Sequence, residues 1–236
     1  MKNIPHQFNN LNKFFEALQT VLQLIEEETP LRDENLGEQL LRNGVINPGR
    51  EGLTIEEYLL EQSAKTPSNR GYHTAARETI KFFKLIGFLI VYDNKSGELT
   101  PSAIQILSIP DENIRKELWR NAFIQLVVEG TDGEISHPYR ILLKLVQDKS
   151  GIETKKLMLA LEAENDSIEE YERIIELSEL SLEEILESTG TSVSMSRNAV
   201  KILPGIAEQL GDIVRRGNNA FPIGRIVITE DEISTE

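Results

Sequence analysis

The chain has 236 residues, enough for one large domain or two modest ones, and 39% hydrophobic side chains suffice for ordinary cores. It has no cysteine, which excludes disulfides, thiolate metal sites and cysteine nucleophiles and suits a reducing cytoplasm. The net charge of −14 opposes DNA binding by the whole surface, because phosphate contacts supply much of DNA affinity. A DNA-binding chain of this composition must therefore segregate its charges.

The sequence lacks the motifs of several other function classes. No apolar run approaches the roughly 20 residues that span a bilayer, and no secretory signal opens the chain, so we expect a cytoplasmic protein without membrane contact. His6, His73 and His137 lie far apart, so we expect no metal site and no cofactor. Pro110-Asp111 and Glu153-Thr154-Lys155 match a nuclease signature by letters, but they fall in predicted helices, and we assign no catalytic residue.

The N-terminal part of the chain is predicted to form three helices. Apolar residues at helical spacing predict a helix from Leu11 to Glu28 and a shorter one from Glu34 to Arg42. Thr54 can cap a third helix that continues to Lys65, and Glu57 stands at the position of a capping box.

The stretch that follows predicts a helix and a β-hairpin. The helix extends from about Tyr72 to Ile86. The aromatic and β-branched run Phe88–Tyr92 is typical of a strand, and Glu98–Thr100 is its expected return. Between them Asp93–Gly97 has turn chemistry, and we expect Gly97 to take a positive φ. A helix followed by a hairpin is the plan of a winged helix-turn-helix.

This helix has one face that can pack and an adjacent face that presents cations. The second face carries His73, Arg77, Lys81 and Lys84, at spacings of four, four and three. The whole stretch has five basic and three acidic residues, so its charge opposes that of the chain. The stripe indicates a DNA-facing helix, although a charged face that only keeps a surface helix soluble is the alternative.

The remainder of the chain is predicted to be helical until a second hairpin. A connector helix and five further helices are expected over Asp111–Val128, Tyr139–Asp148, Ile152–Ala163, Ser167–Glu179, Leu182–Glu187 and from about Ser194, where Pro204 can kink or restart the last one. A strand over Gly211–Val214 and a return over Phe221–Ile228 close this part. The single Trp119 is expected in the core.

The two halves echo each other, and we predict a mainly α fold with small β-hairpins, a tandem winged helix-turn-helix. We place a first winged-helix domain with the connector at 1–130, a second with a helical insertion at 131–229, and an acidic tail at 230–236. Ten acids and three arginines fall in residues 26–64, and eleven acids and one arginine in 162–187. The basic regions coincide with the two helix-plus-hairpin units.

Two passages carry a resemblance to a known family. They are HTAARETIKFFKLIGFLIVYDNKSGELTPSAIQIL and, in the second half, SRNAVKILPGIAEQLGDIVRRGNNAFPIG with the helices before it. Over roughly residues 50–225 the chain resembles the DNA-recognition region of type IIS restriction endonucleases of the AlwI, FokI and BpuJI kind. In that family the recognition part reads an asymmetric site, while a separate nuclease domain cuts at a distance.

The resemblance implies a double-stranded DNA partner and a role in restriction-modification or defence. It implies DNA contacts from Arg70, His73, Arg77, Lys81, Lys84 and Lys95, and from Arg197, Lys201, Arg215 and Arg216. It also allows a separate nuclease subunit that would supply the cut.

Two other functions stay open. The chain also resembles non-catalytic winged-helix partner subunits of the KITE or MukE type, which dock on SMC-like ATPases, and its acidic stretches favour this alternative because they could meet a basic partner. The third reading is a nuclease whose active site the sequence does not reveal.

Overall fold

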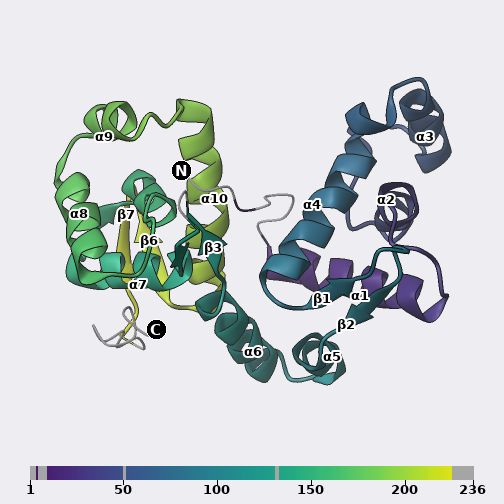
Figure 1. The fold of residues 1–236 in the computed structure, drawn as a ribbon, viewed down its shortest axis with the longest axis horizontal. Coiled ribbons are helices and arrows are strands. Elements are labelled where there is room, and N and C mark those ends of the chain that lie inside the picture. The colour runs from purple at the N-terminus through teal and green to yellow at the C-terminus, as the bar shows by residue number, and fades with distance from the viewer. Residues whose placement is uncertain (1–3, 5–9, 50–51, 131–132, 225–236) are drawn as a thin grey trace. The chain divides into compact units, whose positions relative to one another are not determined.

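The computed structural model describes residues 4, 10–49, 52–130 and 133–224 (Figure 1). The described chain is mainly helical, with one three-stranded and two two-stranded antiparallel sheets, as the sequence predicts at this level. None of its described helices combines the length and apolarity needed to cross a bilayer.

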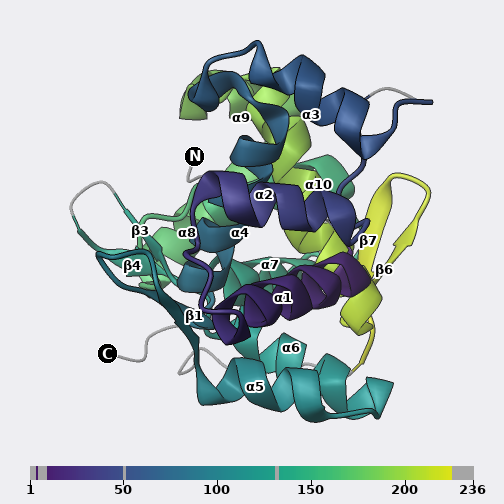
Figure 2. The same cartoon turned by 90° about the vertical axis from the view of Figure 1, so that its right-hand side faces the viewer.

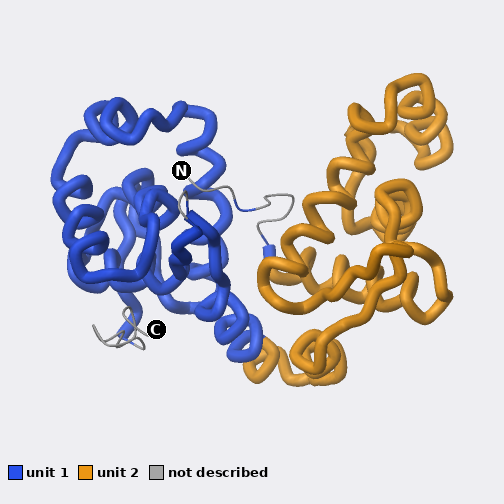
Figure 3. Tube along the Cα trace, viewed as in Figure 1, with its two compact units in different colours: residues 1–10, 116–236 blue, residues 11–115 orange. Residues whose placement is uncertain are grey.

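The chain divides into two compact units (Figure 3). Unit 2 is residues 11–115, and unit 1 is residues 1–10 together with 116–236. The division falls inside a helix, whereas the sequence analysis places the boundary in the turn at residues 131–133.

Unit 2 contains five α-helices and one hairpin among its described residues. They are α1 (Leu11–Glu26), α2 (Asp33–Arg42), α3 (Ile55–Ser63), α4 (Gly71–Leu85), α5 (Pro101–Ser108), β1 (Leu89–Val91) and β2 (Gly97–Leu99), with a 3₁₀ turn η1 at Pro67–Asn69. Helix α1 lies between α2 and α5 (Figure 2). The stacked rings of Phe14 and Phe82, 4.4 Å apart at their centroids, join α1 to α4.

The start of α3 confirms the predicted capping box. The Thr54 hydroxyl accepts from the backbone N–H of Glu57 at 3.2 Å, and the Glu57 carboxylate accepts from the backbone N–H of Thr54 at 2.8 Å. Two backbone donors that a helix start would leave unpaired are thereby satisfied. The bond from the Thr54 N–H lowers the pKa of the Glu57 carboxyl group, and a bond from the Thr54 hydroxyl to the same carboxylate at 2.9 Å lowers it further.

Helices α2 and α4 approach closely at Gly37. A Cβ atom on Gly37 would lie 2.4 Å from the carbonyl oxygen of Tyr72 and 2.7 Å from its ring. Glycine inside a helix costs about 1 kcal/mol relative to alanine, so its presence in α2 has a packing reason. The close contact fixes the face of α4 that is left for solvent.

The hairpin turn differs from the prediction. Lys95, not Gly97, takes the positive φ, at 68°. Gly97 instead begins β2, opposite Val91, and a Cβ atom there would lie 2.3 Å from the Leu31 side chain. The close approach of the Leu31 side chain favours glycine at this position, and the Leu31 N–H donates to the Lys95 carbonyl at 2.7 Å, which attaches the turn to the start of α2.

Unit 1 combines helices with two small sheets. Its elements are α6 (Glu112–Ile124, which begins in unit 2), β3 (Val128–Glu129), β4 (Ile135–Ser136), α7 (Pro138–Asp148), β5 (Ile152–Glu153), η2 (3₁₀, Thr154–Leu161), α8 (Ile168–Glu179), α9 (Leu182–Thr189), α10 (Val193–Leu210), β6 (Ile213–Arg216) and β7 (Asn219–Pro222). The larger sheet has the order β5-β7-β6. Helix α10 packs against η2 and β6 (Figure 1).

Three predicted elements of this unit have different bounds or types. The connector helix ends at Ile124, because Val128 pairs with Ser136 in a hairpin. The expected helix over Ile152–Ala163 is a short strand and a 3₁₀ helix, because Ile152 pairs with Ala220. Strand β7 ends at Pro222, and Ile223 and Gly224 follow it outside any strand, whereas residues 225–228 of the predicted return, like the acidic tail, lie outside the described residues.

A buried polar network holds α6 in the core of unit 1. Asp212 is 1% exposed, and its carboxylate accepts from Arg120 Nε at 2.8 Å and from the Tyr139 hydroxyl at 2.7 Å. Burial and the Asp212 charge raise the pKa of Tyr139 well above its ordinary value. Trp119 is 2% exposed, which confirms it as a core residue.

Candidate nucleic-acid interface

A groove of about 610 Å³ lies in unit 2 between α4, the β1–β2 hairpin and the start of α2. Five of the residues expected to contact DNA line it, namely His73, Arg77, Lys81, Lys84 and Lys95. They come from two elements, since Lys95 belongs to the hairpin turn. The structure therefore brings together most of the side chains that the sequence assigned to a DNA-facing helix and its wing.

The basic residues of α4 lie on its exposed stripe. Helix α4 packs against α2 and buries Ala75 and Ala76, whereas Lys81 and Lys84 are exposed and Arg77 is half-buried. The Lys81 side chain is 63% exposed, and Lys84 is exposed one turn further along. Helical spacing of three to four residues keeps these side chains on one face.

The cations of the groove differ in how far they are already neutralised. Arg77 forms an ion pair with Asp33 at 2.7 Å, and Lys81 one with Glu78 at 3.2 Å. Lys84 and Lys95 have no ion-pair partner among the described residues. The two unpaired ammonium groups are therefore the most available to an external anion, since they give up no existing partner.

His73 does not join the cationic face as expected. It is 4% exposed, its ring packs edge-on against Tyr72 at 4.4 Å, and its Nε2 atom has no hydrogen-bond partner in the described part of the chain. Burial lowers the pKa of His73, and Arg70 lowers it further. The imidazole is therefore neutral at neutral pH and adds no positive charge to the groove.

Two arginines near the groove have roles that the sequence did not indicate. Arg70 donates to the carbonyls of Lys65 and Ser63 at 3.3 and 3.4 Å, so it closes the end of α3 rather than lining the groove. Arg32, the residue before α2, does line the groove. It was missed because it lies in the acidic stretch 26–64, and only the fold brings it beside Lys95.

The predicted DNA-contacting cations of unit 1 are less closely clustered than those of unit 2. Arg197 and Lys201 are exposed on α10, one turn apart. Arg215 is paired with Glu208, with Nε 2.9 Å from the carboxylate, and this pairing lowers the pKa of Glu208. The Arg216 guanidinium stacks over the Phe221 ring at 5.6 Å. Two of the four cations thus have partners within unit 1.

Searches against protein-family models and against curated proteins found no match. Among the described residues no group of three or more His, Asp or Glu side chains could hold a metal ion.

Proposed function

We propose that the chain binds double-stranded DNA, with α4 as the recognition helix and the β1–β2 hairpin as the wing. The observation that carries this proposal is the meeting of Lys84 and Lys95, both unpaired, in a groove between helix and hairpin. They lie in a groove lined by five Lys and Arg side chains and three acidic ones, so the groove is locally basic in a chain of net charge −14. A winged helix-turn-helix places such a helix in the major groove and the wing beside it.

The topology of unit 1 supports a second winged helix. A short strand, β5, follows the first helix of this part, α7, and pairs with the last strand of the terminal hairpin, β7. Helix α10 precedes that hairpin, as α4 precedes its own. Helices α8 and α9 then form the insertion, and Arg197 and Lys201 are the cations that α10 would offer to DNA.

The biological setting that we propose is sequence recognition in a restriction or defence system. The resemblance to type IIS recognition regions supports it, and it assigns the cut to a separate nuclease part or subunit. Selection of bound duplexes from a random pool tests it. A recurring, asymmetric sequence is expected, and a pool that stays random after selection would reject sequence recognition.

The DNA-binding proposal is tested with two single substitutions, Lys84→Glu and Lys95→Glu. Affinity for a fluorescein-labelled duplex is measured by anisotropy between about 50 and 200 mM salt. Each substitution is expected to weaken binding, and each lost phosphate contact reduces the slope of log K against log salt by about 0.9.

The matched control is Lys13→Glu, which makes the same change of charge on α1. Lys13 contacts Glu16 and the carbonyl of Gly44, beyond the C-terminal end of α2, whereas the groove begins at the N-terminal end of α2. Its affinity and slope should match the unaltered protein. If all three variants lost affinity equally, net charge alone would explain the loss. The groove would then not be part of the DNA interface.

A partner subunit of an SMC-like ATPase is the second candidate function. The exposed acids of α8 and α9 favour it, since Glu172, Glu176, Glu183 and Glu187 have no ion-pair partner among the described residues. Unpaired charge of one sign promotes association with a surface of the other sign. A protein of this class should co-purify with its ATPase and retard DNA without sequence preference.

A further inference from the structure

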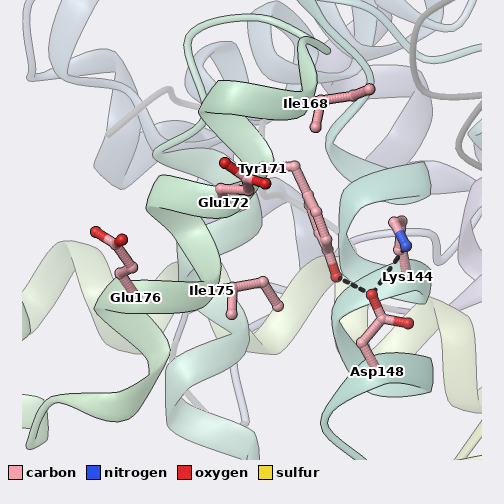
Figure 4. Close-up of a pocket in the computed structure, with 7 residues that line it drawn as sticks. All are labelled: Lys144, Asp148, Ile168, Tyr171, Glu172, Ile175 and Glu176. Carbon is pink, nitrogen blue, oxygen red and sulfur yellow. Dashed lines mark hydrogen bonds and ion pairs between the residues drawn. The ribbon is translucent and has the colours of Figure 1, made fainter.

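A pocket of about 360 Å³ lies in unit 1 between α7 and α8 (Figure 4). Helix α7 contributes Lys144 and Asp148, and helix α8 contributes Ile168, Tyr171, Glu172, Ile175 and Glu176. None of these residues belongs to the proposed DNA-binding surface.

The floor of the pocket is internally paired. Asp148 accepts at one carboxylate oxygen from Lys144 Nζ at 2.9 Å and from the Tyr171 hydroxyl at 2.8 Å (Figure 4). The ammonium group also lies 4.8 Å from the centre of the Tyr171 ring. Burial and Asp148 raise the pKa of Tyr171, so it stays a hydrogen-bond donor. The floor thus needs no ligand to satisfy its charges.

The free groups of the pocket are two isoleucines and two glutamates on α8. Ile168 is 48% exposed, and Ile175 lies two turns further along the same face, with Tyr171 between them. Glu172 and Glu176 form a neighbouring acidic stripe, one turn apart, and Glu176 points away from α7 in Figure 4. Neither glutamate has an ion-pair partner among the described residues. An apolar stripe is thereby bordered by uncompensated negative charge.

We propose that this surface docks a basic amphipathic helix of a partner protein. Apolar side chains of that helix would cover Ile168 and Ile175, and lysine or arginine side chains one turn apart would pair with Glu172 and Glu176. Charge complementarity selects this occupant, because an acidic or neutral helix would leave both carboxylates unpaired at the rim. The inference does not rest on DNA binding, which involves other residues and is measured with another probe.

The probes are three fluorescein-labelled helical peptides of about 15 residues, roughly four turns. All carry the same leucine stripe, and the flanking stripe is lysine, glutamine or glutamate. The intact chain is expected to bind the lysine peptide most tightly and the glutamate peptide least. Absence of binding by the lysine peptide, or an affinity independent of the flanking charge, would overturn the proposal.

Three variants locate the binding site. Glu172→Lys with Glu176→Lys, and separately Ile168→Ser, should each weaken lysine-peptide binding by about tenfold or more, a loss of about 1.4 kcal/mol. Glu183→Lys with Glu187→Lys makes the same charge change on α9, outside the pocket, and should leave affinity within about twofold. Circular dichroism verifies the fold, which these exposed positions should not alter.

Other occupants give distinct results. If the α8 and α9 charge variants lost affinity for the lysine peptide equally, the peptide would be held by overall charge and not at the pocket. That result would overturn the proposal. Sedimentation that shows dimers of the intact chain, lost in Ile168→Ser, would assign the surface to a second copy and also overturn it.

Discussion

His73 is a titratable side chain that unit 2 buries without a hydrogen bond at Nε2. Because burial lowers its pKa below the ordinary 6.5, the unfolded chain binds a proton in acid more readily than the folded chain. The free energy of unfolding contributed by this site is therefore retained at neutral pH and lost as the pH falls below about 6.5. The Glu57 carboxylate titrates lower, from an ordinary value of 4.5, so the two effects occupy separate ranges.

We predict that His73→Leu reduces this acid destabilisation. Leucine removes the titrating group without leaving a new unpaired polar atom in the core. Thermal unfolding followed by circular dichroism should show a smaller loss between about pH 7 and pH 5 in the variant than in the unaltered protein. Parallel pH profiles of the two proteins would contradict the prediction.

Lys95 occupies a left-handed backbone conformation, with φ of 68°, at the tip of the proposed wing. This conformation costs a non-glycine residue about 1–2 kcal/mol, and glycine adopts it freely but loses more chain entropy on folding. Lys95→Gly should raise the free energy of unfolding by up to about 1 kcal/mol and at the same time weaken DNA binding. Urea titration and duplex anisotropy measure the two effects.

The control for Lys95→Gly is Lys95→Ala, which removes the charge and keeps the strain. It should lose the same affinity without gaining stability. If Lys95→Gly lost no affinity, the wing lysine would have no part in DNA binding.

At the scale of elements, the contact between α2 and α4 determines which face of α4 is exposed. Gly37→Ala would place a methyl group 2.4 Å from the Tyr72 carbonyl, a distance that requires the helices to move apart. Overpacking of this kind costs about 1–3 kcal/mol, more than the helix propensity that alanine gains. Urea unfolding should therefore show a net loss of stability. A variant as stable as the original would mean that α4 has room to shift.

Gly49 offers the comparison, because a Cβ atom added there would meet no atom of the described residues within 4 Å beyond its chain neighbours. Gly49→Ala should change stability by less than about 0.5 kcal/mol, the usual range for surface positions.

The sequence predicted those elements whose signals are local. The capping box at Thr54 and Glu57 specified the start of α3. The turn residues Asp93–Gly97, which follow the strand-like run Phe88–Tyr92, specified the first hairpin. It missed what depends on distant partners. The strand at Ile152 exists because Ala220 pairs with it, and an isolated apolar run does not distinguish strand from helix.

The candidate site was predictable to a similar extent. Helical spacing placed Arg77, Lys81 and Lys84 together, but burial of His73 and the ion pair of Arg77 with Asp33 follow from packing against α2. No periodicity within α4 could reveal either.

At the scale of the whole molecule, charge is divided between two surfaces with different predicted partners. Lys84 and Lys95 lie in the groove of unit 2, and the unpaired acids of α8 and α9 lie in unit 1. Exposed charges interact weakly beyond about 8–10 Å at physiological salt. The groove itself is lined by five Lys and Arg side chains and three acidic ones, so it is locally basic although the total charge is negative. If unit 1 also touches DNA through Arg197 and Lys201, tethering to unit 2 raises its effective concentration.

The last prediction concerns where the chain can be cut. A cut after residue 115 leaves Trp119, Arg120 and Phe123 with unit 1, whereas a cut after residue 130 removes them. Trp119 and Phe123 are buried, and Arg120 pairs with buried Asp212. Loss of a large core aromatic costs about 3–5 kcal/mol, comparable to the 5–15 kcal/mol stability of a whole domain.

Residues 116–236 should therefore fold cooperatively, with a Trp119 emission that shifts to the red on unfolding, and residues 131–236 should not fold. Residues 11–115 should bind duplex DNA alone, with the same sensitivity to Lys84→Glu as the intact chain. Cooperative unfolding of residues 131–236 with undiminished stability would contradict the assignment of α6 to the core of unit 1.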